Sequence, residues 1–370
     1  MKVVIATGLY PPEIGGPATY AQLLETKLPA RGFEITIVPF GWVRHYPKGI
    51  RHIVYAWKLF REATQADVIY ALDSASVGLP AVFVSRLKRK PLLIRLGGDY
   101  AWEQGRVRFG YKKTLDEYIE NMQEAPLFMR ALARLQTYVC NRAHTVIVPS
   151  KYLKSIVTKW GINPEDIKVI YSALYPIDVS GTKEELRAQL SYTHPTIVSA
   201  GRLVPWKGFS ALIEAIATLR EKYPEITLVI AGDGEDKKAL EKKVQELGVV
   251  NNVRLVGSIS KDALGASIKG ADVFVLNTAY EGLSHQLIEV MDIGTPIVTT
   301  PAGGNTELIT NNIHGLLVPF NDVSALTEAI SHIIEHPDTQ LRLTQSARGR
   351  SKDFGEVNTL NAIEELLQSL

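Results

Sequence analysis

The 370-residue chain is 46% hydrophobic and 22% charged, which is the composition of a soluble globular protein and not of a disordered or fibrous one. Its length exceeds that of one ordinary core and predicts two domains. A single cysteine, Cys140, excludes an intramolecular disulfide and is typical of a reducing compartment. Residues 1–6 lead directly into an expected strand, without an apolar stretch long enough for a signal peptide or a membrane span. We therefore expect a cytoplasmic protein.

The formal net charge of +2 is unevenly distributed along the chain. Residues 1–180 carry 24 Lys and Arg against 15 Asp and Glu, a net charge of +9, whereas residues 181–370 carry 17 against 24, a net charge of −7. A basic first half is compatible with an anionic substrate or an anionic membrane surface, and ordinary solvated faces explain it equally well. One expectation is therefore peripheral contact of the first half with the inner membrane face. No nucleic-acid partner is expected.

Short runs rich in Val, Ile and Leu alternate with longer amphipathic stretches such as Phe209–Lys222 and Glu235–Leu247. This is the βαβ pattern of parallel sheets that helices cover on both faces. In the first half the expected strands are Lys2–Thr7, Glu34–Val38, Asp67–Ala71, Pro91–Leu96, Thr145–Val148 and Lys168–Ile170. In the second half they are Thr196–Ala200, Thr227–Ala231, Val253–Val256, Asp272–Leu276, Pro296–Thr299 and Gly315–Val318. The predicted fold is α/β, with two Rossmann-like doubly wound domains in sequence.

Two segments interrupt this alternation. The junction between the domains is expected near Tyr171–Thr193, where Pro176 and Gly181 mark loops around a short charged helix. Asp99–Asn141 is a long excursion between two expected strands, with aromatic and basic residues first and a helical run at Leu127–Val139. Such an insertion is expected either to face an acceptor or to cover the sheet.

Glycine-rich loops follow the first strand of each half. Gly15 and Gly16 precede a helix, where backbone amides can approach a phosphate or a sugar closely, although a tight turn without a ligand would look the same. After the strand Thr196–Ala200, a short loop holds Arg202 and Lys207 between Gly201 and Gly208. Two cations fixed at the carboxyl end of a strand favour a diphosphate over a pair of solvated side chains.

Two glutamates, Glu281 and Glu289, follow the apolar run Val273–Leu276. Eight residues is a little over two helical turns, so a carboxylate before a helix and one along it can share a face. They would then lie at the carboxyl end of a strand, where open α/β sheets bind ligands, and would accept hydrogen bonds from sugar or ribose hydroxyls. The residues between them, Gly282, Leu283, Ser284 and His285, begin a helix whose amides can face an anion, although His285 by itself is more often structural.

Together these segments resemble the retaining GT-B glycosyltransferases of family 4, which use nucleotide-sugar donors. The likeness extends over nearly the whole chain and is strongest from Ile197 to Val318. Five motifs follow there in the order of the family: Gly-Arg-Leu…Trp-Lys-Gly, Ala-Gly-Asp-Gly, Val-Gly-Ser-Ile-Ser, Glu-Gly-Leu-Ser…Glu and Gly-Gly-Asn-Thr-Glu.

The resemblance implies a GT-B fold with two Rossmann-like domains facing across a cleft. It implies an acceptor-side domain at residues 1–176, a nucleotide-sugar-binding domain at residues 177–352, and a last helix at residues 353–370 that crosses back to the first domain. Domain closure about the junction would exclude water and limit hydrolysis of the donor.

The resemblance also implies roles for individual residues. Arg202 and Lys207 would grip the donor diphosphate, Glu281 would contact the transferred sugar, and the segment from Gly282 through Leu283 and Ser284 to His285 would lie near sugar and phosphate. Glu289 would bind the ribose, Val256, Ser258 and Ile259 would flank the base, and Gly15 and Gly16 would close over the phosphates. Asp99 matches the aspartate of the family's His-Asp pair, but Gly98 stands in place of the histidine.

The expected activity is retaining transfer of a hexosyl group from a UDP-sugar or GDP-mannose to an acceptor hydroxyl, which could be lipid-linked or part of a glycan. No metal and no cofactor are expected, because no Asp-x-Asp motif occurs and the two cations would replace a metal. The alternatives are a GT-B relative of another reaction type, such as an epimerase, and a non-catalytic nucleotide-sugar-binding protein.

Overall fold

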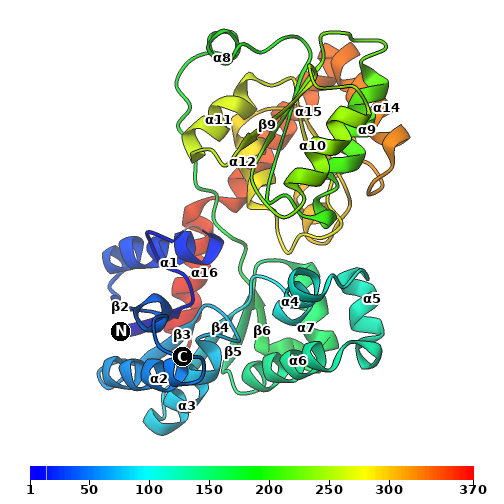
Figure 1. Ribbon diagram of the computed structural model, residues 1–370. Coiled ribbons are helices and arrows are strands. Elements are labelled where there is room, and N and C mark those ends of the chain that lie inside the picture. The colour runs from blue at the N-terminus through cyan, green and yellow to red at the C-terminus, as the bar shows by residue number, and fades with distance from the viewer. Residues whose placement is uncertain (14) are drawn as a thin grey trace. The chain divides into compact units, whose positions relative to one another are not determined.

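The computed structural model describes residues 1–13 and 15–370. The chain divides into two compact units (Figure 1), which we call the N-unit (Met1–Ser172 and Val357–Leu370) and the C-unit (Ala173–Glu356). Each unit is an α/β body built on one sheet of six parallel strands.

The N-unit sheet has the strand order β2-β1-β3-β4-β5-β6. Its strands are β1 (Lys2–Thr7), β2 (Glu34–Pro39), β3 (Val68–Ala71), β4 (Leu92–Arg95), β5 (Thr145–Val148) and β6 (Ile167–Val169). Its α-helices are α1 (Gly16–Lys27), α2 (Ile50–Glu62), α3 (Gly78–Lys88), α4 (Tyr100–Phe109), α5 (Leu115–Glu120), α6 (Leu127–Cys140), α7 (Lys151–Lys159) and α16 (Glu356–Gln368), the last of which begins one residue before the division. Short 3-10 turns lie at Pro29–Arg31, Phe40–Val43, Met122–Glu124 and Pro164–Asp166.

The C-unit sheet has the strand order β12-β11-β10-β7-β8-β9. Its strands are β7 (Thr196–Ala200), β8 (Thr227–Ala231), β9 (Val253–Gly257), β10 (Val273–Leu276), β11 (Ile297–Thr299) and β12 (Leu316–Leu317). Its α-helices are α8 (Lys183–Leu190), α9 (Phe209–Leu219), α10 (Lys237–Glu246), α11 (Lys261–Gly270), α12 (His285–Ile293), α13 (Asn305–Leu308), α14 (Val323–Glu335) and α15 (Pro337–Ser351). The turns Pro205–Lys207 and Lys352–Phe354 are 3-10.

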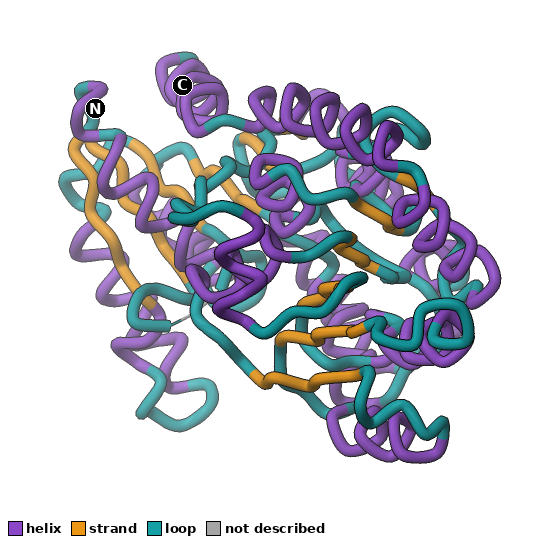
Figure 2. Tube along the Cα trace, turned by 90° about the horizontal axis from the view of Figure 1, so that it is seen from above, coloured by secondary structure: helices purple, strands orange, loops and turns teal. Residues whose placement is uncertain are grey.

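The central strands are almost entirely buried because helices pack on both faces of each sheet, as Figure 2 shows for strands flanked by purple helices. Every residue of β3, β4, β5 and β10 is buried, which explains why these strands read as continuous apolar runs and not as an alternation. Side-chain caps fix several helix starts, including Asp99 for α4, Ser284 for α12 and Asp322 for α14.

All twelve expected strands are present, and their ends differ from expectation by at most one residue. The long excursion at residues 99–141 is three α-helices and a 3-10 turn. The expected helix Phe209–Lys222 ends earlier, at Leu219, because residues 220–223 form turns before Pro224. The helix expected from Glu235 begins at Lys237, after the Asp236 amide donates to the Leu203 carbonyl.

The two units meet in the chain at 172/173 and 356/357, each four residues from the expected boundaries of 176/177 and 352/353. The last helix, α16, belongs to the N-unit. Its Thr359 hydroxyl donates to the Tyr171 carbonyl, and the Arg31 guanidinium bonds Glu364 at 2.6 Å. Ile363 and Leu367 are fully buried, so α16 contributes to the core of that unit.

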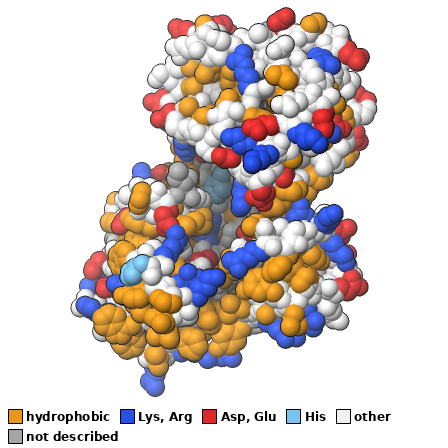
Figure 3. Space-filling model, viewed as in Figure 1, with side chains coloured by type: hydrophobic (Ala, Val, Ile, Leu, Met, Phe, Trp, Pro, Cys, Tyr) orange, Lys and Arg blue, Asp and Glu red, His pale blue; other side chains and the backbone are white. Residues whose placement is uncertain are grey.

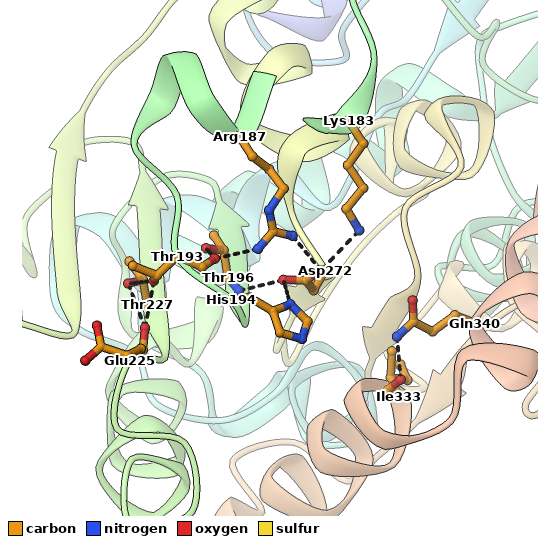
Figure 4. A network of polar contacts seen from close by, with 10 residues as sticks. All are labelled: Lys183, Arg187, Thr193, His194, Thr196, Glu225, Thr227, Asp272, Ile333 and Gln340. Carbon is orange, nitrogen blue, oxygen red and sulfur yellow. Dashed lines mark hydrogen bonds and ion pairs between the residues drawn. The ribbon is translucent and has the colours of Figure 1, made fainter. Parts of the chain in front are cut away.

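A network of polar contacts anchors α8 at the amino edge of the C-unit sheet (Figure 4). Lys183 and Arg187 reach from α8 to the buried carboxylate of Asp272, at 3.1 Å and 2.7 Å. The Thr196 amide donates to the same carboxylate at 2.8 Å and joins the start of β7 to the residue before β10. Burial would raise the pKa of Asp272, but the two cations and the amide hold it below its usual value. The network lies at the amino ends of the strands, whereas the loops with the predicted site residues follow the carboxyl ends. Its role is therefore structural.

Among the described residues, no helix is both long enough and apolar enough to cross a bilayer.

Candidate functional site

Each sheet has one point where its strand order reverses direction. In the C-unit the connections leave β7 toward β8 and β9 on one side, and leave β10 toward β11 and β12 on the other. The loops after β7 and β10 therefore lie at the reversal point, at the carboxyl end of the strands, which is where doubly wound sheets bind ligands. Arg202 and Lys207 lie on the first of these loops, and Glu281 to His285 lie on the second.

The structure brings Lys207 and Glu281 together as an ion pair between the Lys207 Nζ and the Glu281 Oε1. Their side chains are 18% and 15% exposed, so both charges are largely shielded from solvent, which strengthens the attraction between them. Arg202 lies elsewhere on the same loop and is more exposed. Its guanidinium pairs with Glu235 at 3.2 Å, at the start of the segment that follows β8. The two predicted diphosphate cations thus share a loop but have different carboxylate partners.

Backbone contacts hold the Lys207 loop against the β10 loop. The Ala279 amide donates to the Trp206 carbonyl at 2.8 Å, and the Thr278 hydroxyl donates to the same carbonyl. Gly201 has φ +147°, and a Cβ there would contact the Lys207 stem at 3.7 Å. That distance is an ordinary van der Waals contact, so it is the backbone conformation, which L side chains rarely adopt, that favours glycine at this position.

Asn277 is a residue that the sequence analysis missed. Its buried amide donates to the Gly208 carbonyl at 2.8 Å and to the Asn321 side chain, and its Oδ1 accepts from the Asn321 amide at 3.0 Å. Gly208 has φ +54°, and a Cβ there would lie 2.3 Å from the Asn277 side chain. Asn277 therefore fixes the end of the Lys207 loop. The signal in the sequence is a lone Asn at the end of an apolar strand.

The second loop leads into α12, and Glu281 precedes this helix while Glu289 lies on it, as expected. The Gly304 amide donates to the Glu281 carbonyl at 3.0 Å, and a Cβ on Gly304 would lie 2.3 Å from the Gly282 oxygen. Gly282, Leu283 and Ser284 are buried and His285 is half-buried. Ser284 caps the helix by accepting from the Leu287 amide. The positive end of the α12 dipole therefore lies directly after Glu281.

Glu289 lies further along α12, where it forms an ion pair with Lys261 of α11 at 2.9 Å. Burial raises the pKa of Glu289, and Lys261 opposes that shift. A carboxylate that is half-buried and held by a surface lysine keeps acceptor capacity for a second donor group.

The residues expected to flank a base lie at the end of the edge strand β9. The pairing with β8 shifts after Leu255, so that Ala231 pairs with Gly257 and Val256 is left out of register as a bulge. Bulges re-aim side chains and are frequent beside active sites. Val256 and Ser258 are exposed and Ile259 is half-buried, which gives a small surface of apolar and hydroxyl groups.

The remaining predicted site residues lie in the N-unit. Gly15 caps α1 and Gly16 begins it, after the loop that follows β1, and the strand order reverses between β1 and β3. Among the described residues, apart from its chain neighbours and its own helix backbone, no heavy atom lies within 4 Å of the place a Cβ would take at Gly16. This helix start therefore faces open space.

Asp99 is fully buried, where it caps α4 by accepting from the Trp102 amide at 2.9 Å. Its Oδ2 has no hydrogen-bond partner among the described residues. Burial raises the pKa of Asp99 to about 6, and burial together with the Asp99 charge raises the pKa of Glu103 to about 7. Asp99 thus has a structural role as a cap, and its expected contact with the donor sugar stays a prediction.

Two family models match the chain, one to each unit. A model of glycosyl transferases group 1 matches residues 182–350, and a model of glycosyltransferase family 4 matches residues 12–174. The fold and these matches define a GT-B glycosyltransferase. The chain belongs to family 4 of these enzymes.

Individual relatives agree with this assignment. The chain is 33% identical over 176 residues to the lipopolysaccharide core biosynthesis glycosyltransferase LpsE of Rhizobium meliloti, a match that spans about half of each protein (48% and 49%). It is 28% identical to an uncharacterized glycosyltransferase of Methanocaldococcus jannaschii over 90% of this chain and 89% of the relative. Its fold is similar to that of HepE from Anabaena, solved with UDP and glucose, with a TM-score of 0.80 and 21% identity over 100% of both chains.

Proposed function

We propose that the protein is a retaining hexosyltransferase that moves a sugar from a UDP-sugar or GDP-mannose to an acceptor hydroxyl. The observation that carries the proposal is the ion pair of Lys207 and Glu281 at the reversal point of the C-unit sheet, next to the amino end of α12. A half-buried cation, a carboxylate and a helix N-terminus at one point suit a sugar joined to a diphosphate.

In this proposal Lys207 exchanges one anionic partner for another. Without the donor it pairs with Glu281, and with the donor bound its ammonium contacts a diphosphate oxygen. Glu281 then accepts hydrogen bonds from hydroxyls of the transferred sugar. Arg202, which is more exposed and paired with Glu235, closes on the diphosphate from the other side of the loop. Because these groups are cationic, no metal and no cofactor are needed to neutralise the leaving group.

The transfer step requires no reactant besides the donor and the acceptor. The bond between the anomeric carbon and the phosphate oxygen breaks, and the acceptor oxygen forms a bond to that carbon on the same face. The acceptor proton passes to the departing phosphate oxygen. Because the acceptor attacks from the face that this oxygen leaves, the configuration is retained. Negative charge accumulates on the diphosphate as the bond breaks, and Lys207 with the α12 dipole stabilises it most at that stage.

The rest of the donor fits the other predicted residues. Glu289 on α12 would accept from the ribose hydroxyls, and the bulged end of β9 at Val256, Ser258 and Ile259 would flank the base. Gly15 and Gly16 would bring the amino end of α1 to the phosphates. The crystal structures of HepE with UDP and with UDP-glucose support a uridine donor among the candidates, since HepE has the same fold.

A screen of nucleotides tests the proposal. We expect UDP or GDP to raise the melting temperature, because a ligand that binds only the folded state stabilises it by mass action, whereas NAD should not. The matching sugar donor should then release its nucleoside diphosphate in the presence of a chelator, and nuclear magnetic resonance of the product should show the configuration of the donor. No shift with any nucleoside diphosphate, or an inverted product, would contradict the proposal.

A further inference from the structure

Helix α2 of the N-unit carries two apolar stripes instead of one. Tyr55 and Leu59 point into the core and are fully buried. Ile50, Ile53, Trp57 and Phe60 recur at intervals of three and four residues, and all four are exposed, Ile53 by 73%. Successive residues advance by about 100°, so the outward stripe lies opposite the buried one. The outward face of a surface helix is ordinarily polar, and an apolar one indicates an interaction surface.

The neighbouring helix α3 extends this surface. α2 and α3 pack against each other, and α3 exposes Phe83 and Leu87, the latter by 73%. Lys88 joins the two helices, since its Nζ lies 3.6 Å from the centre of the Phe60 ring and donates to the Thr64 hydroxyl at 2.9 Å. In Figure 3 hydrophobic side chains, drawn in orange, gather over this part of the N-unit with Lys and Arg around them. We call this surface the α2–α3 face.

The charges on this surface are almost all positive. Residues 42–62 and 78–90 contain nine Lys and Arg and a single carboxylate, Glu62. The cations lie beside the aromatic rings, with Lys58 5.4 Å from the Trp42 ring centre and Arg61 5.1 Å from that of Trp57. Within residues 1–13 and 15–370, neither Lys58 nor Arg61 forms an ion pair. The partner of this face must therefore offer an apolar layer and negative charge at nearly the same depth.

We propose that the α2–α3 face docks on an anionic lipid surface. At a membrane interface the side chains of Ile53, Trp57 and Leu87 enter the boundary of the acyl chains, while the long Lys and Arg side chains reach the phosphates. Tryptophan and flanking cations are the side chains that this boundary favours. The helix lies in the plane of the interface, and each cation adds attraction to anionic headgroups.

A second exposed apolar group in the same unit does not fit this partner. Phe109 of α4 and Phe128 of α6 contact each other with ring centres 5.3 Å apart, and Leu127 is exposed beside them. Arg108 lies over the Phe128 ring, but residues 100–130 carry five Lys and Arg against five Asp and Glu, so this group lacks the excess of positive charge of the α2–α3 face. The proposal is therefore confined to the α2–α3 face. It does not depend on the proposed transfer reaction.

Co-sedimentation with vesicles tests the proposal. The full chain is mixed with vesicles of phosphatidylcholine alone, and with vesicles of equal parts phosphatidylcholine and phosphatidylglycerol, at low and high salt. We expect binding to the anionic vesicles that salt weakens. Lys58→Glu should lower the partition constant by at least about fivefold, since each cation contributes about that factor near an anionic surface. Trp57→Ser should lower it by about tenfold or more, because burial of a large apolar side chain is lost.

Matched controls lie in the C-unit. Lys238→Glu reverses an exposed charge on α10, and Leu341→Ser removes an exposed apolar side chain on α15. Both should bind anionic vesicles like the wild type. If Trp57→Ser does not fold, Ile53→Ser replaces it. The proposal is wrong if the wild type ignores anionic vesicles, or if the controls lose as much binding as the variants. Conversion from dimer to monomer by Trp57→Ser without vesicle binding would also refute it and would show that the face joins two copies of the chain.

Discussion

The residues of the proposed donor site differ in whether contacts within the fold already account for them. Lys207 and Glu281 satisfy each other as an ion pair, so removing either leaves a largely shielded charge without its partner. Gly208 and Gly304 stand where a Cβ would collide with neighbouring atoms of the same unit, so the fold itself requires them. Gly16 is different, because the described structure contains nothing that a side chain there would meet.

Gly16→Ala separates a structural role from a ligand-binding one. In the absence of a steric conflict, alanine at the start of α1 should leave the melting temperature unchanged or slightly raised. If the α1 terminus closes over the donor phosphates, the added methyl group should raise the KM for the donor by about tenfold, which corresponds to about 1.4 kcal/mol of binding free energy. The measurement is donor kinetics together with a thermal melt. Unchanged kinetics would show that Gly16 makes no such approach, and Gly349→Ala, on α15 with the same open surroundings, is the control.

At the scale of elements, strand positions could be predicted from the sequence because the strands are short runs, most of them rich in Val, Ile and Leu, between turn signals. The two faces of α2 could not be told apart in the same way, since Tyr55 and Leu59 are as apolar as Trp57 and Phe60, and only packing decides which pair is covered. The site loops were predictable as loops. The hydrogen bonds from Asn277 to Gly208 and Asn321 join segments far apart in sequence, and no local pattern indicates them.

The start of α4 gives the fold a pH dependence. Burial raises the pKa of Asp99 from 3.8 to about 6. The folded state therefore holds the proton of Asp99 more tightly than the unfolded chain does. The contribution of this group to the free energy of unfolding is fully present below pH 4 and is lost as pH rises through 6. The shift corresponds to about 3 kcal/mol. Asp99→Asn keeps an acceptor for the Trp102 amide and cannot ionise, so its stability should fall less than that of the wild type between pH 5 and pH 8.

Chemical denaturation at the two pH values measures this difference. Asp322→Asn is the control, because Asp322 also caps a helix through its side chain but is less buried. Parallel losses of stability for the wild type and Asp99→Asn would contradict a raised pKa at this carboxyl group.

At the scale of the whole molecule, the N-unit is discontinuous in sequence, because the last 14 residues of the chain complete it. Its core therefore closes only after the entire C-unit has been synthesised. The sequence showed no feature that would place the last helix, since an amphipathic helix can pack on any apolar surface; the resemblance to a family supplied that expectation.

Ile363→Ala tests the dependence of the N-unit on α16. Ile363 is 1% exposed, and its truncation should cost about 2–5 kcal/mol of the unfolding free energy. Four of the five tryptophans, Trp42, Trp57, Trp102 and Trp160, belong to the N-unit, so tryptophan fluorescence reports mainly on its unfolding. Val357→Ala, at an exposed site on the same helix, should change stability by no more than about 0.5 kcal/mol. An equal, small effect of both substitutions would show that α16 does not support the N-unit.

The most direct test of the proposed donor site is the rate of nucleoside diphosphate release by the wild type and by Lys207→Ala, with the donor that the nucleotide screen selects. Loss of a cation that stabilises the leaving diphosphate should lower kcat by about 100-fold to 1,000-fold. Lys222→Ala is the matched control, because Lys222 forms an ion pair with Glu335 of α14 and precedes β8, on the side of the sheet opposite to the β7 and β10 loops. We expect normal release by Lys222→Ala and a folded but nearly inactive Lys207→Ala. Near-normal release by folded Lys207→Ala would contradict this expectation.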